Sequence, residues 1–172
     1  MNDRLLEGRP AIVTGAAGGI GRGHVLHLAA AGAPVVINDI NETAAAALAA
    51  ARNGASTLLI ENQICLGGMA TAGMVNRLGP YHDQKDLILK GIPWEVLRLL
   101  IDRGLAQEPI ICEPKNWMDY WLVFDPEGMK KVLDELIVAA GVRLLFAAQV
   151  VAPVMDGNRI KGVIIESKSG RQ

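Results

Sequence analysis

A short apolar run that ends in glycines and continues as a helix is the feature that most constrains this fold. The run "AIVTG" has the pattern of a buried strand, and "IGRGHVLHLAAAG" behind it has helical spacing that ends at Gly32. Glycines between the two permit a tight turn and let the backbone approach a pyrophosphate. The helix that follows offers unpaired N–H groups and its positive end to such an anion. The sequence therefore predicts a strand, a phosphate loop and a helix.

The alternation of strand and helix continues to residue 61. The runs "PVVIND" (34–39) and "STLLIE" (56–61) are predicted strands that each end on a carboxylate, and "NETAAAALAAARNG" between them is a predicted helix. Alternation of this kind places the strands parallel in one sheet, with helices crossing over its faces. We expect an α/β fold: a Rossmann-like parallel sheet with flanking helices.

The first unit carries candidate nucleotide-binding residues. Its glycines fit the pattern T-G-x-x-x-G-x-G, and Asp39 lies 24 positions after Gly15, at the tip of the second strand. A carboxylate there can accept hydrogen bonds from the adenosine ribose hydroxyls, and it would repel a 2′-phosphate, which favours NAD over NADP. The predicted binding residues of this unit are Thr14, Gly15, Gly19, Ile20, Gly21 and Asp39.

The run "AIVTGAAGGIGRGHVLHLAAAGAPVVINDINE", roughly residues 10–42, resembles the start of the short-chain dehydrogenase/reductase family. That resemblance implies catalysis by a Tyr-x-x-x-Lys pair with a serine upstream. Tyr81 and Lys85 in "YHDQK" have the required spacing. The family's pair lies further downstream, however, and no serine occurs between Ser56 and Ser167. We interpret the spacing as chance, so the catalytic residues are unknown.

The rest of the chain resembles a different family. Residues 49–76, "AAARNGASTLLIENQICLGGMATAGMVN", and residues 124–172 are similar to FAD-dependent oxidoreductases with a glutathione-reductase-like flavin fold. This resemblance covers most of residues 44–172 and is the more extensive one. It implies that Glu61 holds the FAD adenosine ribose and that the stretch "LGGMATAG" lines the flavin. The candidate residues of this second set are Glu61, Gly67, Gly68 and Thr71.

The two resemblances conflict at the phosphates. Flavoproteins of this type need a G-x-G-x-x-G turn immediately before the strand that ends at Glu61, but the helix there opens with "NETAAAA" and has no glycine. The complete phosphate loop lies one βαβ unit too early, and Asp39 and Glu61 cannot hold the same ribose. We expect a dinucleotide-binding, FAD-dependent type of oxidoreductase with an NAD(P)-binding first unit. The alternative is a non-catalytic nucleotide-binding or scaffold domain, from a recombined or truncated chain.

The chain is expected to form one domain over residues 1–172. Its parts are a βαβαβ core (1–62), a loop and helical insertion (63–123), and a helix, strand and hairpin (124–172). "VRLLFAAQV" is a predicted strand, and the turn "DGN" predicts the hairpin. The expected further strand after "SKSG" has almost no residues left, which suggests truncation. An exposed sheet edge could then pair with a second copy to make a homo-oligomer.

Composition excludes several partners. The net charge is −1 with scattered basic residues, so nucleic acid is not expected. The apolar runs are short of the roughly 20 residues that span a bilayer, and the N-terminus lacks a signal-peptide core. We expect a cytoplasmic protein with a small-molecule dinucleotide as partner and no membrane association. Cys65 and Cys112 have no zinc-site spacing, and the pair His24 and His27 has no third ligand, so no metal site is predicted.

Overall fold

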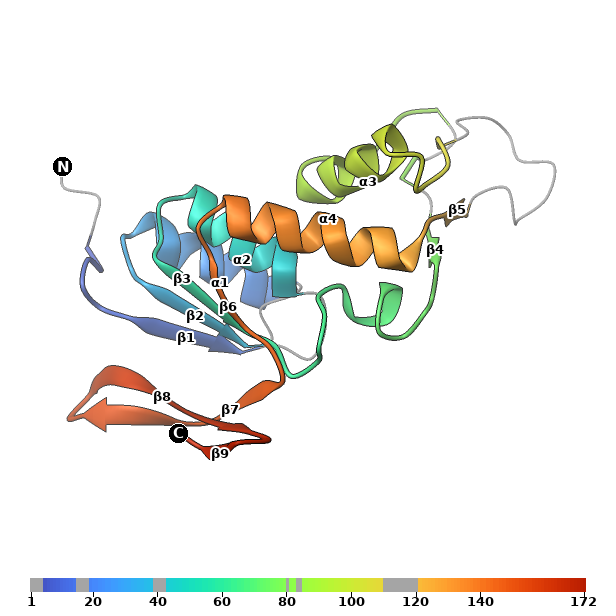
Figure 1. Ribbon diagram of the computed structural model, residues 1–172. Coiled ribbons are helices and arrows are strands. Elements are labelled where there is room, and N and C mark those ends of the chain that lie inside the picture. Colours follow the sequence, from blue (N-terminus) through green and yellow to red (C-terminus); the bar gives the residue numbers. More distant parts are fainter. Residues whose placement is uncertain (1–4, 15–18, 39–42, 80, 83–84, 110–120) are drawn as a thin grey trace.

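The computed structural model describes residues 5–14, 19–38, 43–79, 81–82, 85–109 and 121–172. Figure 1 shows three layers. Helices lie above a parallel sheet, and a small antiparallel sheet lies below it. The predicted α/β class, with a Rossmann-like parallel sheet, flanking helices and a C-terminal hairpin, is confirmed.

The parallel sheet has the strand order β1-β2-β3-β6. Its strands are β1 (Ala11–Thr14), β2 (Val35–Asn38), β3 (Thr57–Ile60) and β6 (Arg143–Leu145). Thr14 is paired with Asn38, Asn38 with Ile60, and Ile60 with Leu145. The four strands therefore end at the same level, and the loops after them emerge along one edge of the sheet.

Helices α1 (Gly19–Ala30), α2 (Thr43–Arg52) and α4 (Pro126–Ala139) cover one face of the sheet. Successive strands add in one direction, so right-handed crossovers put their helices on the same side. Val13, Val35 and Leu59 point into this layer and are at most 7% exposed. Most alanines of α2 are buried as well, because methyl side chains let this helix lie between α1 and α4.

Capping residues fix the ends of α4. Asp125 is its N-cap and accepts a hydrogen bond from the Gly128 N–H at 2.9 Å, and Pro126 occupies the first helical position. Gly141 follows the helix with φ at +74°, a conformation that favours glycine. Local sequence therefore marks both ends of this helix, with a cap and a proline at its start and a glycine after its last turn.

The insertion between β3 and α4 packs on the helical layer. It contains a 3-10 turn η1 (Gly68–Ala70), α3 (Ile92–Asp102) and the short paired strands β4 (Arg77–Leu78) and β5 (Leu122–Val123). Arg52 at the end of α2 donates two hydrogen bonds, of 2.6 and 2.7 Å, to the Glu95 carboxylate of α3. These hydrogen bonds lower the pKa of Glu95 and raise that of Arg52. The ion pair is partly exposed, so most of the attachment comes from the apolar contacts of α3 and α4.

The C-terminal antiparallel sheet consists of β7 (Ala148–Asp156), β8 (Arg159–Ser167) and β9 (Gly170–Arg171). The predicted hairpin about "DGN" is present as the β7–β8 pair. The prediction of one strand over "VRLLFAAQV" is wrong. The chain leaves the parallel sheet after Leu145, passes Ala147 at a φ of +52°, and enters β7. One continuous, mainly apolar stretch thus contributes strand residues to both sheets.

Two expectations about organisation stay predictions. One is the division into residues 1–62, 63–123 and 124–172, and the other is the pairing of a sheet edge with a second copy. Within the described residues β1 has β2 as its one neighbour in the sheet. Cys112 lies outside the described residues.

Asp134 on α4 is a polar group in an unfavourable position. Its Oδ1 atom is buried and makes no hydrogen bond within the described part of the chain, and burial raises the pKa of its carboxyl. An acid whose pKa is higher in the folded state reduces stability once the pH is above that folded value. This cost disappears as the pH falls below the pKa of the unfolded chain.

We therefore predict that Asp134→Asn increases the free energy of unfolding by about 1 kcal/mol near pH 7. The gain should vanish near pH 3, where the carboxyl is already neutral. Urea unfolding at both pH values measures the effect. The control is Asp102→Asn, which removes the same charge from the exposed ion pair with Arg98. An equal gain from Asp102→Asn would mean that net charge, and not burial, is responsible.

Candidate dinucleotide-binding site

Three of the predicted binding residues directly follow the strands of the parallel sheet in sequence. Gly15, Asp39 and Glu61 are each the next residue after a strand, behind β1, β2 and β3, and these strands end in register. Gly15 and Asp39 lie outside the described residues, so the structure places only the strand ends that precede them. Adjacent strands are about 4.8 Å apart, so the end of β2 neighbours both others, while β1 and β3 are two spacings apart.

Two helices start just after this edge. Gly19, Ile20 and Gly21 form the first turn of α1, and α2 starts at Thr43. Neither helix has an acidic residue in its first turn, although Glu42 directly precedes α2 in the sequence. The side chains of Thr14 and Ile20 are outside the described ones. Phosphate binding at the start of α1 stays a prediction, because residues 15–18 lie outside the described residues.

Glu61 is fixed at the end of β3. Glu61 is 8% exposed, and its Oε1 accepts a hydrogen bond from the Gln63 backbone N–H at 2.8 Å. Its backbone N–H donates to the Leu145 carbonyl at 2.9 Å, and its own carbonyl accepts from the Ala148 N–H at 3.2 Å. The point where β6 gives way to β7 therefore clamps Glu61. This clamp is what the sequence reasoning missed, because residues far along the chain supply it.

The turn at residues 67–73 owes its glycines to its own packing. Gly67 has a φ of +100°, and a Cβ on it would lie 2.6 Å from the Thr71 methyl. A Cβ on Gly73 would lie 2.9 Å from the backbone of Met69. Thr71 is fully buried and its hydroxyl donates to the Leu66 carbonyl, so its side chain points into the turn. Lining of a flavin by Gly67, Gly68 and Thr71 stays a prediction, and the backbone is the part that could provide it.

A cavity of about 120 Å³ lies between the glycine turn and the helices. The start of α2, the glycine turn, α3 and α4 all contribute to its wall. Its lining residues are Ala44, Ala45, Gly67, Ala70, Leu78, Tyr81, Ile92, Pro93, Val96, Met129 and Leu133. The lining is apolar apart from Tyr81, whose hydroxyl donates to the Pro93 carbonyl at 3.3 Å.

Tyr81 belongs to the core of the insertion. It is 6% exposed and clusters with Leu97 and Leu122, with its ring centroid 6.3 Å from that of Trp94. Lys85, at the dehydrogenase spacing, is exposed. His24 and His27 are both exposed on α1. The described residues contain no group of three or more His, Cys, Asp or Glu placed to hold a metal ion.

The residues fit a flavin cofactor in part. Glu61 ends a strand beside the start of α2, as the ribose acid of a flavin-type unit should. The turn before α2 does not fit the phosphates, because its sequence "DINE" supplies two carboxylates and no glycine. The first unit, β1–α1–β2, differs from it, because the sequence before α1 is rich in glycine and has no carboxylate.

Comparison with known sequences decides the family. The sequence model described as FAD dependent oxidoreductase matches residues 42–172. The chain belongs to this family. A second model, short chain dehydrogenase, matches residues 9–72. Both resemblances seen in the sequence are thus confirmed, and they overlap across α2 and β3. Both families are dinucleotide-binding.

The individual matches are longer proteins. An uncharacterized oxidoreductase of Mycobacterium tuberculosis (strain CDC 1551 / Oshkosh) is 41% identical over 91 residues, which are 51% of this chain and 31% of that protein. Thermovibrio ammonificans THI4 matches 96% of this chain and 50% of its own, at 16% identity and a TM-score of 0.39. A geranylgeranyl bacteriochlorophyll reductase-like protein of Thermoplasma acidophilum matches 95% and 36%, at 17% identity and a TM-score of 0.46. The chain spans half or less of these proteins. Across its described residues, no helix has the length and apolar character to cross a membrane.

The glycine turn makes a test of local packing. We predict that Gly67→Ala lowers the free energy of unfolding by about 2 kcal/mol, because the methyl meets Thr71 and φ is positive. Gly23→Ala is the matched control. It adds the same methyl in open space on α1 and should raise stability by up to about 1 kcal/mol. Thermal unfolding measures both, and equal effects would show that the turn is not tightly packed.

Proposed function

We propose that this chain is the dinucleotide-binding part of an FAD-dependent oxidoreductase and holds FAD along the carboxyl edge of its parallel sheet. The proposal rests on family membership over residues 42–172 and on the position of Glu61. When bound, the flavin supplies the redox chemistry, and the protein supplies binding and orientation. No catalytic residue of this chain is assigned.

The clamped carboxylate of Glu61 is the observation that carries the proposal. An acid at the end of the second strand of a βαβ unit accepts hydrogen bonds from the adenosine ribose. Glu61 ends β3, and the unit that contains it is β2–α2–β3. Its hydrogen bond from Gln63 and the backbone clamp hold the side chain in place before any ligand arrives. Such preorganisation reduces the entropy lost on binding.

NAD is a second candidate, favoured by the glycines of the first unit. Phosphates at the start of α1 would place the ribose beside the next strand, β2, and therefore beside Asp39. Glu61 is one strand further away and would not reach that ribose. The FAD and NAD arrangements thus use different acids and different helix starts. A domain that binds a nucleotide by either route without turnover is the remaining alternative.

The first experiment is an absorption spectrum of the protein after incubation with FAD and desalting. We predict a retained flavin band, and we predict that Glu61→Gln weakens FAD binding about tenfold or more, because a hydrogen bond to a charged acceptor is lost. Glu127→Gln is the control, since it neutralises an exposed carboxylate of α4 that pairs with Lys130. Gly19→Glu should leave FAD binding intact in this arrangement.

Titration with NADH separates the two candidates. If the first unit holds the nucleotide, Gly19→Glu abolishes binding and Asp39→Asn weakens it about tenfold, while Glu61→Gln has no effect. This pattern, together with a colourless protein after the FAD incubation, would refute the flavin proposal in favour of NAD. Binding of either nucleotide without turnover would support the non-catalytic nucleotide-binding alternative, and the absence of all binding with a normal unfolding curve would support a scaffold domain.

A further inference from the structure

The two faces of the parallel sheet are covered unequally. Along each strand, the residues that point to the helices are shielded from solvent. Val35 and Leu59, for example, are at most 1% exposed. Their neighbours Ile12, Val36 and Leu58 point to the opposite face and are only half-buried. Parallel sheets normally have both faces covered. The antiparallel sheet therefore covers the second face loosely.

A cavity of about 310 Å³ fills the gap between the two sheets. It lies toward the amino ends of the parallel strands, opposite the dinucleotide edge. Its lining residues are Pro10, Ala11, Ile12, Pro34, Val35, Val36, Ser56, Leu58, Arg143, Ile160, Lys161, Gly162 and Val163. The wall is mainly aliphatic, with Arg143 and Lys161 as its charged members. We call this space the interlayer slot.

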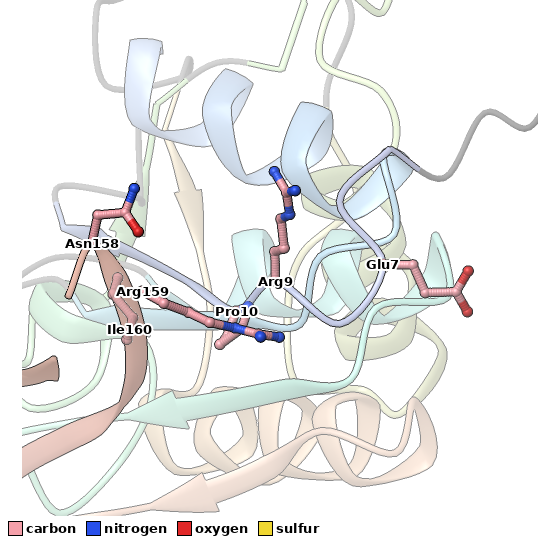
Figure 2. A pocket seen from close by; sticks show the side chains of 6 residues that line it. All are labelled: Glu7, Arg9, Pro10, Asn158, Arg159 and Ile160. Carbon is pink, nitrogen blue, oxygen red and sulfur yellow. The ribbon is translucent and has the colours of Figure 1, made fainter. Parts of the chain in front are cut away.

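A polar cavity of about 420 Å³ adjoins the interlayer slot and shares Pro10 and Ile160 with it. Figure 2 shows this mouth, which Glu7, Arg9, Asn158 and Arg159 also line. Arg159 extends from the hairpin past Pro10, and its Nη2 donates to the Gly8 carbonyl at 2.7 Å. A guanidinium has five N–H donors, so this bond leaves others for a ligand.

Positive charge prevails around the interlayer slot and its mouth. The cations are Arg9, Arg143, Arg159 and Lys161, against the single carboxylate of Glu7 in the two linings. Lys161 pairs with Asp156 at 3.5 Å. The side chains of Arg9 and Arg143 make no hydrogen bond or ion pair with the described residues. An aliphatic space with a cationic rim complements a molecule that has an apolar chain and an anionic end.

We propose that the interlayer slot binds an amphipathic carboxylate, such as a medium-chain fatty acid. The chain lies between the two sheets, and the carboxylate lies at the mouth against Arg159 and Arg9, which both line it. This site is independent of the dinucleotide edge, which is at the other end of the strands. A second copy on a symmetric interface would bring the same cations face to face, which is unfavourable.

The test is calorimetric titration of the full chain with decanoate below its micelle concentration. Decanoate should bind saturably, decanol more weakly because it lacks the charge, and acetate not at all. Arg159→Gln should weaken decanoate about tenfold, but it also removes the bond to Gly8. Arg9→Gln avoids that problem, since it removes a charge at the mouth and no hydrogen bond of the described chain, and it should weaken decanoate several-fold.

Two further variants make the result decisive. Arg77→Gln is the charge control, because Arg77 is exposed on β4, away from the interlayer slot, and its side chain is likewise without a described partner. Val163→Trp places a large side chain in the interlayer slot, because Val163 lines it, and this variant should abolish decanoate binding.

The proposal fails if decanoate does not bind, if decanol binds equally well, or if Arg77→Gln acts as strongly as Arg9→Gln. It also fails if light scattering shows a dimer that Val163→Trp dissociates and decanoate does not, because a second copy would then cover the slot.

Discussion

The register of the parallel sheet is the constraint on which the rest of the structure depends. Hydrogen bonding pairs Thr14, Asn38, Ile60 and Leu145 across four strands, so every strand ends at one level. A shift of one residue in β3 would turn Leu59 from the helical layer to the opposite face and move Glu61 away from its clamp. The same backbone hydrogen bonds thus determine which side chains are buried under the helices and which acidic residue follows β3 at the carboxyl edge of the sheet.

Strand β2 gives this sheet an unusual property, because it belongs to two dinucleotide-type units at once. It is the second strand of the unit that starts at β1 and the first strand of the unit that ends at Glu61. Its terminal loop must then act as a ribose contact in one unit or as a phosphate turn in the other. The carboxylates of "DINE" suit the first role and oppose the second. Competition between the units is therefore built into the topology.

Much of the fold could be predicted from the sequence, since it follows from local patterns. The alternation of apolar runs and helices indicated the parallel sheet, and Asp125, Pro126 and Gly141 marked the ends of α4. The break at Ala147 could not be read locally, because the apolar residues on both sides of it look alike and only the destination of the chain separates them. Likewise "GGMATAG" suggested ligand contacts, whereas Gly67 and Gly73 are needed by the turn itself. Such requirements depend on atoms that meet only after folding.

The interlayer slot and the clamp on Glu61 share this origin. Both arise where segments far apart in sequence meet: Pro10 with Ile160 in one case, and Glu61 with Leu145 and Ala148 in the other. Periodicity reports which residues are buried, but it does not report how completely a second layer covers a sheet. The loose cover under Ile12, Val36 and Leu58 is therefore visible only in three dimensions.

The alanine surface of α2 has a consequence for how such a chain can arise. A methyl group has no rotamers to match and little shape to accommodate, so neighbours of different ancestry can pack on it without a clash. The two family matches overlap on this helix and on β3. Helix α2 can therefore pack against the elements of either family, so a junction between the two types of unit at this helix would preserve the core. Asp39 and Glu61, the two candidate ribose acids, flank the helix in sequence, and such a junction would leave both of them in place.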